Sequence, residues 1–220
     1  LVVVEDACEA VGTYCTEGRH KGRHAGTIGH VGVYSFNGNK IITTGGGGLI
    51  SSGNADWLKK ARHLSTQSKA DEVRFLHDCV GFNYRMTSLQ AALGLAQLEQ
   101  LESFVEAKRS NYDLYMRLIE SISGLRLLPF RDGVRSNKWF YSLYLSNGYK
   151  LTRDGLIQQL SAVGIQSRPI WELMHRLPFN KGYEAFKIEC AERYLDNVVN
   201  IPCSTNLTSD DIERVVRNLR

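Results

Sequence analysis

Short apolar runs that end in polar residues characterise the first fifty residues of the chain. Leu1–Val4 is apolar and mostly β-branched, and it leads directly into Glu5 and Asp6. This pattern predicts a buried parallel strand with carboxylates at its carboxyl end, where open α/β sheets bind ligands. A second apolar run ends at Phe36 and gives way to an N-G-N segment. We expect a strand followed by a tight turn there.

Helical spacing replaces this pattern in the middle of the chain. Residues 54–65 carry apolar positions at helical intervals, with Asn54 as a possible N-cap. Residues 88–119 form a much longer helical pattern, which we expect to bend or break around Ser103. We expect one broad face of this pattern to pack in the core between domains; its members are Leu89, Leu93, Ala96, Gln97 and Leu101.

The pattern changes again after Gly124. Residues 126–128 and 139–145 predict strands, and residues 153–163 and 209–219 predict helices. We therefore expect two domains. Residues 1–122 would be part of a large domain including a long interdomain helix, and residues 123–220 a small C-terminal α/β domain.

Composition narrows the class of protein. The 220 residues are 43% hydrophobic, which is ample for a core, and the net charge of +4 is too small to name a partner. The basic residues are interleaved with acidic ones, so we expect no nucleic acid partner. No apolar stretch reaches membrane-spanning length and no leader opens the chain, which favours a cytoplasmic protein. Five dispersed cysteines indicate reduced thiols rather than a disulfide framework.

Lys40 has the most suggestive sequence context. It ends the segment V-G-V-Y-S-F-N-G-N-K and precedes I-I-T-T-G-G-G-G, so a strand end and a turn would hold its side chain against rigid backbone. Desolvation there disfavours the ammonium form and frees the amine to attack a carbonyl, as in Schiff-base lysines. The alternative is a surface lysine beside a turn, because most lysines are exposed.

Asp6 and Glu9 add to this chemistry. If Lys40 carries pyridoxal phosphate (PLP), the cofactor needs an acid at its pyridine nitrogen, and Asp6 is the candidate. Glu9 lies on the same side three residues later and could accept a hydrogen bond from the ring hydroxyl. Asp6 could equally be the N-cap of a helix over residues 7–11.

Three ordered segments carry a resemblance to a known family: E-D-A-C-E-A-V-G, G-T-I-G-H-V-G-V-Y-S-F-N-G-N-K-I-I-T-T-G-G-G-G and G-F-N-Y-R-M-T-S-L-Q-A-A-L-G-L-A-Q-L-E-Q-L. Together they resemble the DegT/DnrJ/EryC1/StrS family of PLP-dependent sugar aminotransferases. The later segments G-I-Q-S-R-P-I-W-E-L-M-H-R-L-P-F and N-I-P-C-S-T-N-L-T extend the resemblance over nearly the whole chain. It implies a fold type I PLP-dependent transferase (aspartate aminotransferase-like), here a partial large domain with a mainly parallel sheet plus the small α/β domain.

The resemblance also assigns roles to residues. It makes Lys40 the Schiff-base lysine and proton shuttle, and Asp6 the partner of the pyridine nitrogen. Glu9 stands where many members have glutamine next to the cofactor hydroxyl. Ser35 matches the phosphate-binding serine. Asn83 matches an asparagine that reaches the cofactor phosphate of the neighbouring subunit, which implies a homodimer with shared active sites.

Two further residues match positions near the sugar nucleotide. Arg168 is suited to a diphosphate by its fork of donors, although a surface ion pair is an equal alternative. For His175 the alternative is a packed or solvent-facing imidazole.

The resemblance implies transamination, with glutamate as amino donor and a keto sugar nucleotide as acceptor. Among subgroups the sequence is most similar to 4-aminotransferases of the legionaminic acid or bacillosamine routes, which implies a UDP-linked 4-keto-6-deoxy amino sugar and a role in bacterial surface glycans. A dehydratase branch of the family carries histidine in place of the lysine, so Lys40 favours transamination. Whether C3 or C4 is aminated stays open.

Three rival interpretations are weaker. Residues 45–48 are four glycines, but a P-loop needs lysine after its glycines. Cys15, His20, His24 and His30 lie close together without the spacing of a zinc finger, and a flexible loop over the cofactor fits better, so we expect no metal. The third rival is a non-catalytic member that binds a ligand or partner.

The first residue, Leu1, lies within a predicted strand that no preceding helix covers. We therefore expect an N-terminal part to be missing, the part that in the family carries a glycine-rich phosphate loop and an aromatic residue stacked on the cofactor.

Overall fold

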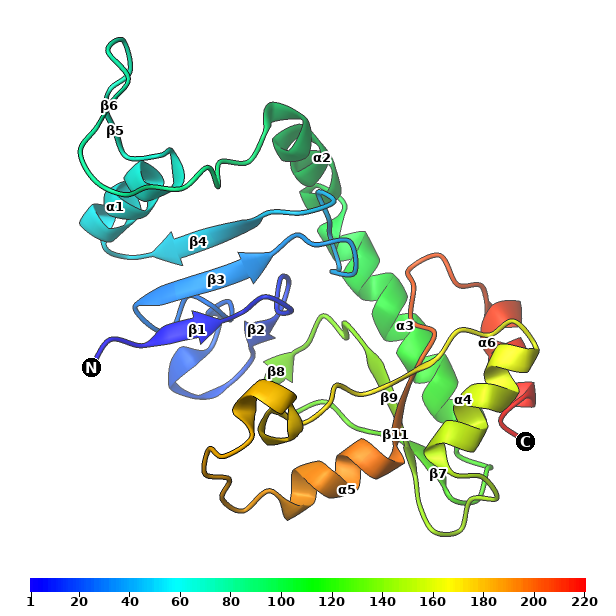
Figure 1. Cartoon of the computed structure of the whole chain (residues 1–220). Coiled ribbons are helices and arrows are strands. Elements are labelled where there is room, and N and C mark those ends of the chain that lie inside the picture. Colours follow the sequence, from blue (N-terminus) through cyan, green and yellow to red (C-terminus); the bar gives the residue numbers. More distant parts are fainter. The chain divides into compact units, whose positions relative to one another are not determined.

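The computed structural model describes residues 1–220 and separates into two compact units (Figure 1). The first unit contains residues 1–105 and 131–139, and the second contains residues 106–130 and 140–220. Helix α3 (Leu101–Ile119) begins in the first unit and ends in the second. Each unit has its own cluster of buried apolar residues.

A three-stranded sheet forms the centre of the first unit. Its order is β1 (Val4–Asp6), β3 (Val31–Ser35) and β4 (Gly48–Ser52). The prediction that the first strand is a parallel one is confirmed, because β1 runs parallel to β3 with Asp6 opposite Val33. Strand β4 runs antiparallel to β3, with Gly48 opposite Ser35. Asp6 and Ser35 therefore lie at the same end of the sheet, where β1 and β3 both finish.

The predicted burial of the first strand is wrong. Val2, Val3 and Val4 are each at least half exposed. The physical reason is that β1 is the edge strand of a small sheet, and no other element covers these side chains.

Helix α1 (Ala55–Ser65) confirms the predicted helix and its cap. The Asn54 side chain accepts hydrogen bonds from the backbone N–H groups of Asp56 and Trp57 at 3.0 and 3.2 Å. Such a bond satisfies a donor that the first helical turn leaves without a partner.

The long helical pattern divides in two. Helix α2 (Ser88–Leu98) begins with a capping box of Thr87 and Gln90, and α3 begins at Leu101, so the break falls before Ser103. The predicted core face is mostly wrong: Leu89 is 85% exposed and Leu93 is 46% exposed, whereas Leu101 is buried. Helical periodicity identifies an apolar face but does not supply an element to cover it.

The remaining elements of the first unit are short. Strand β2 (Tyr14–Cys15) pairs with β8 (Val134–Arg135), and β5 (Lys69–Asp71) pairs with β6 (Leu76–His77). A 3₁₀ turn, η1, covers Gly18–His20. Residues 7–11 form turns, so the alternative of a helix capped by Asp6 is wrong. The buried cluster consists of Ala7, Val11, Tyr34, Ile42, Leu101 and Val105.

The second unit is built on a four-stranded antiparallel sheet in the order β10-β11-β9-β7. The strands are β10 (Arg168–Pro169), β11 (Val198–Ile201), β9 (Tyr141–Leu145) and β7 (Leu125–Leu127). Its α-helices are α4 (Arg153–Ala162), α5 (Glu189–Asn197) and α6 (Ser209–Arg217), and its 3₁₀ turns are η2 (Met174–Arg176) and η3 (Pro178–Asn180).

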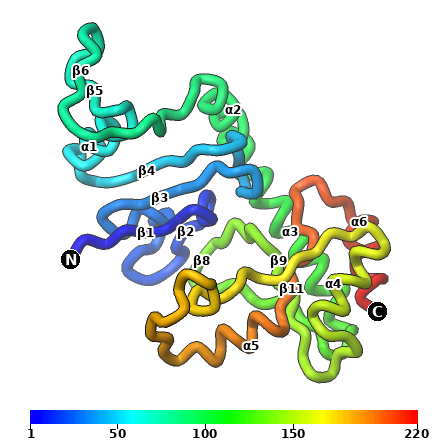
Figure 2. Tube along the Cα trace, in the orientation of Figure 1, coloured from blue at the N-terminus to red at the C-terminus, as the bar shows by residue number.

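The predicted strands and helices after Gly124 are confirmed within two residues at each end. The alternating burial of β9 explains this success, because Tyr141, Leu143 and Leu145 all point into the core. Figure 2 follows the chain through this unit from α3 to the C-terminus. None of the helices is both long enough and apolar enough to cross a membrane.

Candidate active site

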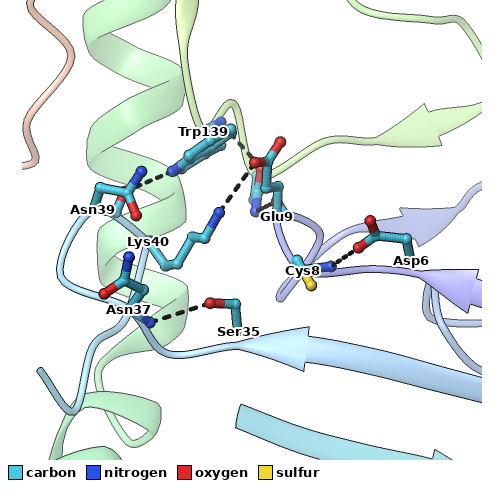
Figure 3. A network of polar contacts seen from close by, with 9 residues as sticks. Asp6, Cys8, Glu9, Ser35, Asn37, Asn39, Lys40 and Trp139 are labelled. Carbon is cyan, nitrogen blue, oxygen red and sulfur yellow. Dashed lines mark hydrogen bonds and ion pairs between the residues drawn. The ribbon is translucent and has the colours of Figure 1, made fainter. Parts of the chain in front are cut away.

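Lys40 lies in a turn at the carboxyl end of β3 (Figure 3). Its backbone N–H donates to Asn37 O at 3.1 Å, and its Nζ donates to Glu9 Oε1 at 3.0 Å. The Lys40 side chain is only 12% exposed, whereas that of Glu9 is 49% exposed. The expectation that the Lys40 side chain is kept out of bulk water is confirmed, and Glu9 provides a hydrogen-bond acceptor for the amine.

Trp139 forms one wall of the Lys40 site. Lys40 Nζ lies 4.3 Å from the centroid of the Trp139 ring, a cation–π geometry. The indole Nε1 donates to Asn39 O at 2.7 Å, so the same side chain also fixes the turn that carries the lysine. Figure 3 shows Glu9, Lys40 and Trp139 converging from three separate segments.

The segment after Lys40 is fixed by side-chain hydrogen bonds. Thr43 N–H donates to Gln97 Oε1 of α2 at 2.9 Å, and the Thr43 hydroxyl donates to Phe36 O at 3.0 Å. The glycines that follow form the turn into β4, with positive φ at Gly45 and Gly47. That conformation is readily available to glycine and explains the glycine-rich sequence without a nucleotide loop.

Asp6 carries the carboxylate at the end of β1. Its Oδ1 accepts the backbone N–H of Cys8 at 3.2 Å. Hydrogen bonds from the Cys8 thiol and backbone N–H, together with the positive charge of Lys40, hold the pKa of Asp6 below its ordinary value. The same contact with Asp6 raises the pKa of the Cys8 thiol. Asp6 is thus an anion at neutral pH.

Glu5, the other acid of this strand, faces away from the site. Its carboxylate accepts backbone N–H groups from Gly26 at 2.8 Å and Ile28 at 2.6 Å, and also one from Gly29. Desolvation alone would raise the pKa of Glu5, but these donors and the charge of Arg23 hold the pKa below its ordinary value. Adjacent residues of a strand point to opposite faces, so Glu5 anchors a loop while Asp6 faces the site.

Asn137 is a residue that sequence reasoning missed. Its Nδ2 donates to Glu9 O at 2.8 Å and to Val11 O at 2.9 Å, and its Oδ1 accepts Trp139 N–H at 3.0 Å. Asn137 is buried and links the Glu9 turn to the Trp139 segment. No motif marks Asn137 or Trp139 as a site residue. The strand pattern of residues 139–145 includes Trp139 but gives no sign of contacts about a hundred residues away.

Ser35 lies beside the Lys40 turn, whereas Asn83 makes its contact just after α1. The Ser35 hydroxyl accepts Asn37 N–H at 3.2 Å, which places it beside the Lys40 turn (Figure 3). Asn83 is exposed and forms an isolated β-bridge with Thr66, just after α1.

Arg168 and His175 both belong to the second unit. Arg168 is exposed on β10, opposite Asn200 of β11. His175 Nε2 lies 3.8 Å from Glu192 Oε1, which also accepts from Arg176 at 3.1 Å. In this structure His175 therefore has an acidic neighbour from α5.

The histidines near Cys15 have separate structural partners. His24 Nε2 accepts Gly12 N–H at 2.9 Å, and its ring packs edge-on against Tyr14. His30 Nδ1 accepts Val3 N–H at 3.0 Å, and His20 Nε2 accepts from Arg19 at 2.8 Å. Each of these three imidazole rings therefore has a hydrogen-bond partner within the first unit.

A sequence model described as the DegT/DnrJ/EryC1/StrS aminotransferase family matches residues 1–220. The chain is 37% identical over 220 residues to GDP-perosamine synthase from Caulobacter vibrioides, covering 100% of this chain and 58% of that protein. It is 35% identical over 222 residues to EpsN of Bacillus subtilis, described as a pyridoxal phosphate-dependent aminotransferase, covering 99% of this chain and 55% of that protein.

A solved aminotransferase structure has a fold similar to that of this chain. The aminotransferase TlmJ from Streptoalloteichus hindustanus superimposes with a TM-score of 0.89 at 27% identity, over 100% of this chain and 58% of that one. The expected fold type I architecture is confirmed. The chain spans somewhat more than half the length of the relatives it matches.

Proposed function

The chain belongs to the DegT/DnrJ/EryC1/StrS aminotransferase family, and from this premise we propose that the protein is a PLP-dependent aminotransferase acting on a keto sugar nucleotide. The observation that carries the proposal is the Lys40 cluster. The shielded amine of Lys40, the anionic Asp6 and the Ser35 hydroxyl all lie at the carboxyl end of the parallel strands β1 and β3.

The polar side chains at this end of the sheet fit pyridoxal phosphate. An aspartate whose pKa is lowered stays ionised, as is needed beside a protonated pyridine nitrogen. Ser35 offers a hydroxyl for the phosphate, and Lys40 offers a primary amine for the aldehyde carbon. Glu9 extends from the turn that follows β1 and offers its carboxylate to the ring hydroxyl. Pyridoxal phosphate bound here supplies an electron sink that acidifies the α-carbon of an amino donor.

The protein's own residues provide positioning and proton transfer. Glu9 and the Trp139 ring restrict Lys40 Nζ to a small region, so its amine is already oriented before substrate arrives. With its amine free, Lys40 would take the proton from the donor α-carbon as a general base and would hold it on Nζ for return as a general acid. The buried indole of Trp139 limits access of water to one side of the amine.

The proposal also covers the substrates and the oligomeric state. We place glutamate as donor and a UDP-linked 4-keto-6-deoxy amino sugar as acceptor, with GDP-linked sugars as the competitor suggested by the names of the perosamine relatives. Arg168 and His175 are the proposed contacts to the sugar nucleotide. Asn83, exposed beyond α1, is proposed to reach the cofactor phosphate of the neighbouring subunit in a homodimer.

Two other functions remain as competitors. In the family, dehydration accompanies histidine at the lysine position, and Lys40 argues against it. A ligand-binding member without turnover would keep the fold while lacking amine transfer, and adding glutamate distinguishes it, since only a catalyst converts its bound cofactor to the amino form.

The proposal is tested with borohydride and Lys40→Ala. We expect borohydride treatment of the PLP-loaded protein to fix the pyridoxyl group on the peptide that contains Lys40, as measured by mass spectrometry. Lys40→Ala should lose this label and slow glutamate-dependent amination by about 10² to 10⁴-fold. Lys21→Ala, an exposed lysine of the same unit, is the control and should behave as the parent. Labelling elsewhere, or full activity in Lys40→Ala, refutes the proposal.

A further inference from the structure

Three groups capable of binding a metal meet at the C-terminal end of α1, away from the Lys40 cluster in sequence. His63 lies in the last turn of α1, and Asp78 and Cys79 follow β6 directly. His63 Nε2 and Asp78 Oδ1 are 2.6 Å apart, and the ligand atoms of all three residues lie within 4.8 Å of one another. None of these side chains has a role in the proposed aminotransferase chemistry.

Backbone hydrogen bonds hold the segments that present these groups. Ser68 N–H donates to His63 O at 2.9 Å, and Asp78 N–H donates to Ser68 O at 3.1 Å. Ser68 is fully buried and adopts a positive φ, so it joins the end of α1 to the hairpin in one fixed turn. A site with little remaining backbone freedom loses little conformational entropy when it binds an ion.

The donor set is that of a zinc site. Imidazole nitrogen, carboxylate oxygen and thiolate sulfur are all ligands of Zn²⁺, at about 2.0 to 2.3 Å. Around a tetrahedral ion such ligand atoms lie roughly 3.3 to 3.7 Å apart. Since His63 and Asp78 are 2.6 Å apart and all three atoms lie within 4.8 Å of one another, movements of about 1 Å, which separate His63 from Asp78 and close the wider spacing, would admit the ion.

We propose that His63, Asp78 and Cys79 form a Zn²⁺ site, with water as the fourth ligand. The hydrogen bond between His63 and Asp78 accounts for two of the residues alone, but the Cys79 sulfur adds a third candidate ligand at the same point. Asp78 and Cys79 are exposed, which leaves room for the water. The ion would cross-link α1 to the segment that follows β6 and would stabilise the bridge between Thr66 and Asn83.

Cobalt titration of the chelator-treated protein tests the site, because Co²⁺ substitutes for Zn²⁺ and gives an absorbance band when it binds thiolate. We expect one equivalent of Co²⁺ to produce the band and Zn²⁺ to abolish it. Cys79→Ser should lose the band and His63→Gln should weaken binding about 100-fold or more, since even outer-shell changes cost 10 to 100-fold. Cys190→Ser, an exposed cysteine of the second unit, is the matched control and should keep the band. A band that persists in Cys79→Ser, or no binding at all, overturns the proposal.

A second measurement needs no substitution and so is independent of whether the variants fold. Iodoacetamide alkylates exposed thiols, and Zn²⁺ bound to Cys79 should slow its alkylation at least tenfold while leaving Cys190 unchanged, as followed by peptide mass spectrometry. Equal rates for Cys79 with and without Zn²⁺ refute the site. Neither readout depends on PLP or on transamination, so the two proposals fail separately.

Discussion

The two units of the chain are stabilised in different ways. The buried cluster of the second unit contains seventeen residues, drawn from α3, α4, α6 and the four-stranded sheet, whereas that of the first unit contains six. Exposed large apolar side chains occur in both units, for example Phe75 and Leu89 in the first and Phe179 and Phe186 in the second, so the difference lies in the size of the buried cluster. The residues of the proposed chemistry nevertheless lie in the first unit. The contrast shows that a site can be positioned by directional hydrogen bonds even where apolar burial is sparse.

These directional contacts converge on the Lys40 turn. Trp139 Nε1 donates to Asn39 O, Gln97 Oε1 accepts Thr43 N–H, and both contacts join segments more than fifty residues apart. A hydrogen bond contributes only about 1 kcal/mol net, but its geometry is specific, so a few such bonds define the position of a turn. In the second unit the same precision comes from close packing.

The largest expected difference between the units appears when leucines are truncated. Leu156 of α4 is fully buried, and Leu156→Ala should lower the free energy of opening of the second unit by about 2 to 5 kcal/mol. Leu89→Ala, on the exposed face of α2, should change the stability of the first unit by no more than about 0.5 kcal/mol. Native-state hydrogen exchange of β9 and α2 amides measures both. Equal losses would contradict the contrast drawn above.

A smaller effect is expected from Trp139→Phe. Phenylalanine keeps an aromatic ring beside Lys40 but cannot donate to Asn39 O, so the turn should lose about 1 kcal/mol of local stability. Faster exchange of the Lys40 amide, which donates to Asn37 O, reports this loss. Trp57→Phe on α1 is the control and should leave that amide unchanged. An unaltered exchange rate in Trp139→Phe would show that packing, not the hydrogen bond, holds the turn.

The smallest effect is expected from removing the Cys8 thiol. Cys8→Ala should move the pKa of Asp6 part of the way back toward its ordinary value, because the thiol is the largest contributor to the lowering while the Cys8 N–H and Lys40 remain. Since the folded pKa of Asp6 is lowered, its contribution to stability is present above the unfolded pKa of about 3.9 and is lost as pH falls through the folded pKa.

Carbon-13 NMR titration of the Asp6 carboxylate follows this shift, and it should show a higher midpoint in Cys8→Ala. Cys15→Ala, on β2, provides the matched control with an unchanged midpoint. A lower or identical midpoint in Cys8→Ala would mean that the thiol does not donate to Asp6 in solution.

Elements with strong local signals were predictable. Asn54 caps α1 as expected, the alternating pattern of β9 and the helical pattern of α6 end close to their predicted bounds, and the parallel pair of β1 and β3 is present. Burial was not predictable to the same degree. The apolar face of α2 and the valines of β1 are exposed, because a sequence pattern does not say whether another element covers a face.

The sequence alone determined the chemical character of the site. Lys40 follows a strand and a tight turn, and Asp6 ends a neighbouring strand. Local periodicity and strand direction therefore suffice to bring an amine and a carboxylate to the same end of the sheet. Only the tertiary structure decided that Glu5 faces away, that Asn137 and Trp139 complete the site and that His63 meets Asp78 and Cys79. The physical reason is the sequence separation of the residues involved. Turns, helix caps and strand alternation depend on residues that are near one another in the sequence, whereas these contacts depend on how distant segments pack.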